Sequence, residues 1–319
     1  KVMGAGGNVL FGNGALINNQ VGGVVSLEND EAMQYSFGSG SSVSNSGTIT
    51  KDFSSGTTTF TSNLALNNNA GGKVNVQSGT LSLSGGGTNA GTFNVSSGKT
   101  LEIAGATYTV ASGGLFSNTG LYRVNGGVLA VNAPLSVVNL DFAAGTLRGS
   151  DTTTVTGTFN WTGGTIGNGA DAGSVLVTGT ANLSGSANAR TLNAYTLTNA
   201  GTLNMTGVGG NLLFGNSSAL VNQSGATINL QNDESFLHSF GSVSTVNNAG
   251  TILKSASSRE QRVQRRDDVQ RRGAQRDHQR RDVQRDDTRD QSAVVERNHS
   301  RYLDAGCRQY RGLADRLAG

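Results

Sequence analysis

The chain has 319 residues, with 47 glycines, one proline and one cysteine, and its formal net charge is +3. High glycine without proline excludes a collagen-like or proline-rich chain. No apolar run is long enough for a membrane-spanning helix and no leader segment is visible, so we expect a piece of a longer protein whose export signal lies elsewhere.

The charge divides the chain into two parts. Residues 1–254 contain eight Lys or Arg and ten Asp or Glu, whereas residues 255–319 contain sixteen and eleven. The only cysteine, Cys307, lies in the second part, which excludes a disulfide framework or a cysteine-ligated metal site in the first. We therefore predict two domains, residues 1–258 and residues 259–319.

Short strands separated by Gly, Asn, Asp or Ser are predicted along the whole first domain. In chain order they are residues 8–11, 24–27, 48–51, 57–61, 73–76, 80–83, 92–95, 100–103, 107–110, 121–124, 128–131, 135–142, 152–161, 174–177, 181–183, 191–197, 202–205, 211–214 and 226–230. Residues 28–36 are the one segment with a helical pattern. This order predicts an all-β domain.

A phrase of the form Asn-x-Gly-Thr-φ-x-φ, in which φ is apolar, recurs among these strands. It is clearest at residues 89–95 (NAGTFNV) and 199–205 (NAGTLNM), and looser copies begin near residues 45, 69, 118, 223 and 248. Asn and Gly are expected to supply a positive φ or an Asx-type turn, and Thr-φ-x-φ has the period of a half-buried strand. Recurrence at roughly 20–30 residues is typical of a solenoid, in which each coil, or rung, packs on the next.

A sandwich or barrel and a parallel solenoid could both use such strands. The recurring Asn, Gly and Thr favour the solenoid, because stacked rungs place like side chains above one another in hydrogen-bonded ladders. Irregular spacing of the phrase favours a β-helix with loops of variable size. We therefore predict a parallel β-helix (β-solenoid) with short irregular rungs.

The sequence also contains a longer repeat, which includes copies of the Asn-x-Gly-Thr-φ-x-φ phrase. Residues 8–51 align without a gap on residues 211–254, at an offset of 203. The shared text includes LFGN, NDE, SFG and GTI. A gapless match of this length indicates a large repeating module.

After residue 258 the alternation of apolar and polar residues stops and Arg and Asp dominate. Reading each codon one base late can restore the phrase, since residues 280–286 (RRDVQRD) can be reread as AGTFNVT. Our hypothesis is a frameshifted reading of further repeats, and the alternative is an ordinary disordered tail. Interleaved acidic residues argue against a nucleic-acid binder, so no nucleic-acid partner is expected.

The acidic turn at residues 28–31 (ENDE) recurs at residues 231–234 (QNDE). Its clustered oxygens suggest a weak candidate calcium site, with the ligands Asp30, Glu31, Asp233 and Glu234. A carboxylate pair for glycoside hydrolysis is a second interpretation, and a solvated turn is the third and favoured one. The spacing matches neither an EF-hand nor a calcium-binding nonapeptide.

Other candidates have simpler interpretations. His238 is replaced by Tyr35 in the earlier copy, which favours a packed or surface residue. Trp161 is expected in the core or at a rung edge rather than as a sugar platform. No catalytic residue, cofactor or further metal site is predicted.

Threonines alternate at residues 57, 59 and 61 and at residues 152, 154, 156 and 158. A row of hydroxyls on one strand face could order water, as in ice-binding solenoids. These pairs do not recur at one rung position in the sequence, which makes ice binding a minor alternative.

By NAGTFNV, NAGTLNM and GTFNWTGGTI, residues 1–254 resemble the repeat regions of filamentous-haemagglutinin-like adhesins and autotransporter passenger regions. The resemblance implies a right-handed parallel β-helix on a bacterial cell surface or outside the cell, acting as a stalk or adhesive fibre. Because no catalytic group is predicted in these residues, we expect a non-enzymatic role. The expected partners are host or environmental glycans, surfaces or end-to-end copies of the chain. The alternative function is a polysaccharide-binding or polysaccharide-cleaving β-helix.

Overall fold

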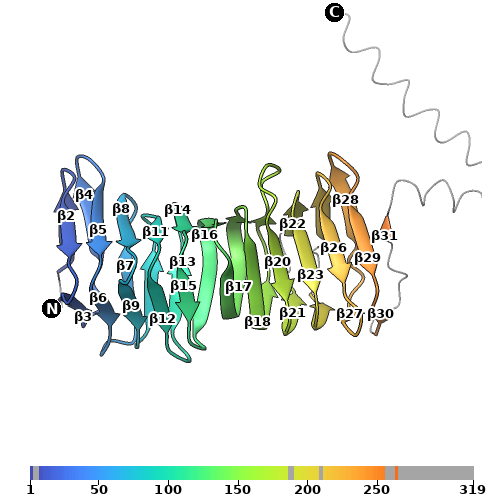
Figure 1. Ribbon diagram of the computed structural model, residues 1–319, viewed down its shortest axis with the longest axis horizontal. Coiled ribbons are helices and arrows are strands. Elements are labelled where there is room, and N and C mark those ends of the chain that lie inside the picture. The colour runs from blue at the N-terminus through green and yellow to red at the C-terminus, as the bar shows by residue number, and fades with distance from the viewer. Residues whose placement is uncertain (3–6, 186–189, 208–210, 256–262, 265–319) are drawn as a thin grey trace, which may run out of the picture. The chain divides into compact units, whose positions relative to one another are not determined.

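The computed structural model describes residues 1–2, 7–185, 190–207, 211–255 and 263–264. All regular elements in these residues are β-strands, and their pairings are parallel. They form a β-solenoid of about 11 rungs, which confirms the predicted all-β parallel architecture. Figure 1 shows the rungs side by side, from the blue strands β2 and β3 to the orange strands β29 and β30. The predicted tail lies outside the described residues, apart from the short strand at 263–264.

Each rung contributes one strand to each of three stacks, which we name faces A, B and C. Along face A, each strand pairs with the strand one rung before it and one rung after it. Its strands are β1 (Val9–Gly12), β4 (Met33–Phe37), β7 (Thr57–Phe60), β10 (Thr80–Leu83), β13 (Thr100–Ile103), the start of β16 (Leu121–Val131), the middle of β17 (Leu135–Arg148), the end of β18 (Thr152–Trp161), β21 (Thr180–Leu183), β24 (Thr202–Met205), β27 (Thr227–Leu230) and β30 (Thr251–Lys254).

Face B follows the same rule. Its strands are β2 (Leu16–Asn19), β5 (Ser41–Asn45), β8 (Leu64–Asn68), β11 (Gly87–Asn89), β14 (Thr107–Val110), the ends of β16 and β17, β19 (Thr165–Ile166), β22 (Arg190–Asn193), β25 (Leu212–Gly215), β28 (Phe236–Phe240) and β31 (Val263–Gln264).

Face C is divided into two segments. The first is β3 (Val24–Leu27), β6 (Thr48–Lys51), β9 (Lys73–Val76), β12 (Thr92–Val95) and β15 (Leu115–Ser117), and the second is the starts of β17 and β18, β20 (Ser174–Val177), β23 (Thr196–Asn199), β26 (Ala219–Asn222) and β29 (Thr245–Asn248). The long strands β16, β17 and β18 cross the corners of the coil and join all strands but the first five of face C into one sheet.

Alternate residues of the strands fill the inside of the coil. In β12, for example, Phe93 and Val95 are buried and Thr92 and Asn94 point outward, as the two-residue period of a strand requires. The buried apolar residues of successive rungs form one continuous cluster. Trp161 belongs to this cluster with no exposed surface, which confirms that it is a core residue.

The recurring phrase forms a corner between two faces. Its Asn ends one strand and points inward, and its Thr begins the next strand and points outward. The expected Asx-type turn is present at Asn199, whose Oδ1 accepts a hydrogen bond from the Gly201 N–H at 3.3 Å. The alternative, a positive φ, is found at Asn118 in a looser copy of the phrase, whereas Gly91 and Gly201 do not have one. Glycine is needed there because a Cβ would lie 2.3 Å from the carbonyl oxygen of Gly72 and 2.1 Å from that of Gly179, respectively.

The inward Asn side chains stack into two ladders. On face B, each of Asn19, Asn45 and Asn68 donates its Nδ2 to the Oδ1 of the next rung, ending at Asn89, with lengths of 2.6, 2.8 and 2.8 Å. On face C, Asn199, Asn222 and Asn248 continue the pattern at 2.8 and 2.7 Å. Each ladder satisfies amides that would be costly to bury unpaired.

The two copies of the long repeat form corresponding strands, with a rotation between them. Strands β25 to β30 occupy the positions of β1 to β6 in the aligned text, at the same offset of 203 residues. Face A passes from β1 to β24 in nine steps, and β25, the copy of β1, is the next strand and lies on face B. The module therefore comprises nine rungs and one third.

Some sequence predictions were wrong. The helical pattern at residues 28–36 corresponds to a turn followed by strand β4. The predicted strand at residues 191–197 is two strands on different faces, β22 and β23. Several polar strands were missed, including β2 (LINN), β5 (SSVSN) and β26 (ALVN). Each of these strands ends in an inward Asn of a ladder, where an apolar residue would be expected. The alternation of apolar and polar residues is therefore too short to indicate a strand.

Candidate functional site

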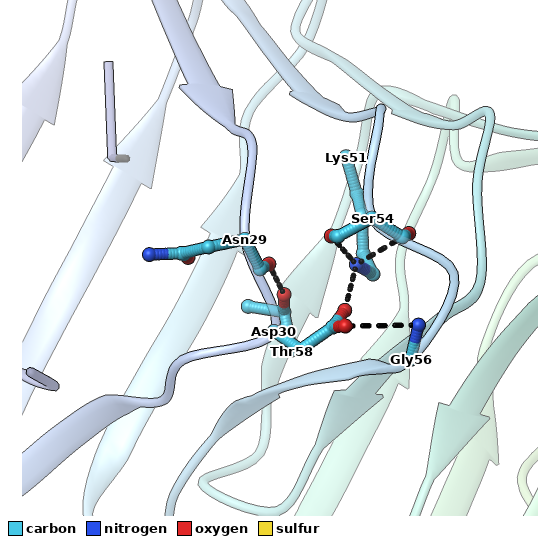
Figure 2. Close-up of polar contacts among 6 residues, drawn as sticks. All are labelled: Asn29, Asp30, Lys51, Ser54, Gly56 and Thr58. Carbon is cyan, nitrogen blue, oxygen red and sulfur yellow. Dashed lines mark hydrogen bonds and ion pairs between the residues drawn. The ribbon is translucent and has the colours of Figure 1, made fainter. Parts of the chain in front are cut away.

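The acidic turn between β3 and β4 is the candidate site that the sequence singled out. It lies at the corner where the chain passes from face C to face A, and the following rung brings Lys51, at the end of β6, against it. Figure 2 shows Asp30 pointing toward the Lys51 ammonium and the loop residues Ser54 and Gly56. The turn therefore faces a cation supplied by its own chain.

The Lys51 side chain is fully buried, with no exposed surface. Its Nζ lies 3.0 Å from Asp30 Oδ1, 2.9 Å from Ser54 Oγ and 3.3 Å from the Ser54 carbonyl oxygen. An ammonium has three N–H donors, and these three acceptors use all of them. We call this arrangement the Lys–Asp clamp.

The Asp30 carboxylate accepts hydrogen bonds on both oxygens. Oδ1 accepts from Lys51, and Oδ2 accepts from the Gly56 N–H at 3.1 Å. Partial burial acts to raise the pKa of Asp30, but the hydrogen bonds from Lys51 and Ser54 outweigh it, so the pKa lies below its ordinary value of 3.8. The Thr58 hydroxyl donates to the Asn29 carbonyl at 2.7 Å and fixes the turn from the other side.

The second copy of the turn repeats the clamp. Lys254 Nζ lies 3.1 Å from Asp233 Oδ1 and donates to the Asn232 carbonyl oxygen. Here the lysine side chain is 29% exposed, compared with none for Lys51. The pairing of an acidic turn with the lysine 21 residues later is thus a property of the long repeat.

This geometry bears on the calcium interpretation. Asp30 and Asp233, the two aspartates among the candidate ligands, each bind a lysine ammonium. Glu31 and Glu234 lie in the same turns and have other interactions. Within the described ranges, no three His, Cys, Asp or Glu side chains gather as a metal-binding group. The calcium site stays a prediction, and it would require each aspartate to release its lysine.

Other ion pairs also connect consecutive rungs. Arg123 Nη2 lies 3.1 Å from Asp141 Oδ2, and Arg148 Nη1 lies 3.1 Å from Asp171 Oδ2. The Arg123 pair joins β16 to β17 on face A, and the Arg148 pair joins β17 to the loop after β19. Like the clamp, these pairs hold neighbouring rungs together.

The remaining sequence candidates are not gathered at the clamp. His238 is a partly buried residue of β28, in register with Phe214 one rung earlier. The sequence reasoning missed a row of outward Thr and Asn side chains on face A, because only the strand register shows that they stack. The residues of the arginine-rich tail, including Cys307, lie outside the described part of the chain.

The geometry places the chain in a structural class, the parallel β-solenoids with stacked asparagine ladders. No protein-family model, curated protein or solved structure matches the chain. In the part of the chain that the structure describes, no helix is long and apolar enough to cross a membrane.

Proposed function

We propose that the chain is a non-enzymatic structural or adhesive segment of an extracellular or cell-surface protein, a stalk or fibre. The observation that supports this most directly is the use of the charged side chains. Lys51 with Asp30, Arg123 with Asp141 and Lys254 with Asp233 each join one rung to the next. Groups arranged in this way stabilise a rod, since each rung of a solenoid is held only by its neighbours.

The long repeat also supports this proposal. A module that recurs after 203 residues with its strands, its asparagine ladder and its clamp extends a rod without changing its cross-section. Length is what a stalk or fibre requires. The partners we propose are environmental or host glycans, other surfaces, or further copies joined end to end, because a parallel strand stack can be extended strand by strand.

A glycan array combined with a polysaccharide-cleavage assay on the full chain tests the proposal. Binding without product is expected of an adhesive segment, and neither binding nor product is expected of a stalk. Release of new reducing ends from any polysaccharide would overturn the proposal in favour of a β-helix enzyme. The complete gene is a second test, since it should encode further modules of this length and an export signal.

A further inference from the structure

Face A carries a regular array of outward Thr and Asn side chains between β18 and β27. Thr158, Thr180, Thr202 and Thr227 are in register on four consecutive rungs. Two residues after each Thr, an Asn is in register with the same neighbours, at positions 160, 182, 204 and 229. We call these eight residues the Thr–Asn face. Of the threonines that the sequence singled out at residues 57–61 and 152–158, only Thr158 belongs to this face.

The array could not be recognised from the sequence, in which the alternating threonines at residues 152–158 are the more obvious pattern. Thr152 and Thr154 are outward on face C, whereas Thr158 is outward on face A. The predicted single row from 152 to 158 is therefore wrong, since β18 crosses a corner at Gly157. The recurring threonines lie 22 to 25 residues apart in the chain and become neighbours only through strand pairing.

The Thr–Asn face is a two-dimensional grid. Neighbouring parallel strands lie about 4.8 Å apart, and outward residues two positions apart along a strand are about 6.6 Å apart. The residues between them, including Phe159, Leu203 and Ile228, are fully buried, so both members of each Thr-x-Asn pair point to the same side. None of the eight outward positions carries a charge or an aromatic ring.

Three of the four asparagines of the grid are joined by side-chain hydrogen bonds. Asn182 Nδ2 donates to Asn160 Oδ1 at 3.0 Å, and Asn204 Nδ2 donates to Asn182 Oδ1 at 3.1 Å. Threonine is stiff about χ1 because it is branched at Cβ, which fixes its hydroxyl and methyl groups relative to the strand. All four threonines are half-buried.

We propose that the Thr–Asn face adsorbs to ice. A rigid grid of uncharged hydroxyl, methyl and amide groups suits a ligand that itself repeats in two dimensions over a few ångströms, as the water lattice of an ice face does. A single glycan chain repeats in one dimension, and the aromatic platforms on which sugars stack are missing from these eight positions. Charged groups would bind their own hydration water. In the described face A strands they occur before the array, at Glu102, Arg123 and Asp141, and after it at Lys254, which is in register with the buried Leu230.

Ice recrystallisation inhibition and thermal hysteresis of the full chain test this inference. The wild type is expected to inhibit recrystallisation, and Thr180→Tyr/Thr202→Tyr should lose at least about tenfold of that activity because two rings interrupt the grid. The matched control is Ser174→Tyr/Thr196→Tyr, which places the same rings on face C, on the strands β20 and β23 of two neighbouring rungs, and should retain the activity. Circular dichroism verifies folding. If the tyrosine variant does not fold, Thr180→Val/Thr202→Val keeps the side-chain shape and should also lose activity.

An inactive wild type, or equal losses in the variant and its control, would overturn the inference. Retention on crystalline cellulose or chitin without ice activity would assign the face to a polysaccharide. A change in sedimentation caused only by Thr180→Tyr/Thr202→Tyr would assign it to a second copy of the chain. The outcome is separable from that of the proposed function, because glycan binding and polysaccharide cleavage are read in assays without ice.

Discussion

The Lys–Asp clamp is asymmetric at the scale of single residues. The Lys51 side chain is fully buried, while that of Asp30 is 44% exposed. Removing one partner of a buried pair is costly mainly when the remaining charge cannot reach water. The two halves of the clamp should therefore differ in their mutational cost.

We predict that Asp30→Ala destabilises the solenoid more than Lys51→Met does. The first leaves a buried ammonium with only the two Ser54 oxygens, at a cost of about 3 kcal/mol. The second leaves a carboxylate that water can solvate. Urea unfolding followed by circular dichroism measures both. Asp233→Ala is the matched control and should cost less than Asp30→Ala, because Lys254 is already part-exposed; equal costs would contradict the argument.

The clamp should also depend on pH. The folded-state pKa of Asp30 is lowered from 3.8, so its contribution to stability is complete above that value and is lost as the pH falls through the lower folded-state pKa. The difference in unfolding free energy between the wild type and Asp30→Asn should be constant near neutral pH and shrink below about pH 4. Urea titrations at several pH values test this. A difference that grows as the pH falls would contradict a lowered folded-state pKa for Asp30.

The asparagine ladders belong to the scale of the strand. Asn68 accepts from Asn45 and donates to Asn89, both at 2.8 Å, inside the coil. We predict that Asn68→Ala costs about 1–3 kcal/mol, because the Oδ1 of Asn89 then lacks its donor in a buried position. Asn67→Ala, on the outward side of the same strand, is the control and should cost less than about 0.5 kcal/mol. Chemical denaturation compares the two variants, and a similar loss in both would argue against the ladder.

Corner glycines form a second prediction at this scale. A Cβ at Gly91 would lie 2.3 Å from the Gly72 carbonyl oxygen, a contact with backbone that cannot move without displacing a rung. A Cβ at Gly98 would meet nothing within 4 Å, and only its φ of +71° opposes substitution. We expect Gly98→Ala to cost about 1–2 kcal/mol and Gly91→Ala to cost more. Thermal unfolding ranks them, and the reverse order would contradict the close-approach explanation.

These elements show where sequence reasoning stops. Alternating text such as TFNV at β12 and TLNM at β24 is enough to predict strands, because inside and outside differ in polarity. A segment such as LINN at β2 is not enough to predict a strand. Its buried Asn19 is a residue type typical of loops, and only the ladder explains why it lies inside the coil. Likewise the acidic turn was visible, but its lysine partner 21 residues away was not. Which residues become neighbours on consecutive rungs depends on the length of each rung, and rung length cannot be read from the sequence.

At the scale of the whole molecule, the 203-residue repeat is not a whole number of rungs. Its extra third moves β1 from face A to the copy β25 on face B, and moves the ladder from face B to face C. Where modules follow one another at this spacing, each surface feature of one module recurs in the next module rotated by about one third of a turn around the solenoid axis. The fourth module restores the first orientation. Such a filament would present each patch in three directions in turn, and it could engage partners on all sides without bending.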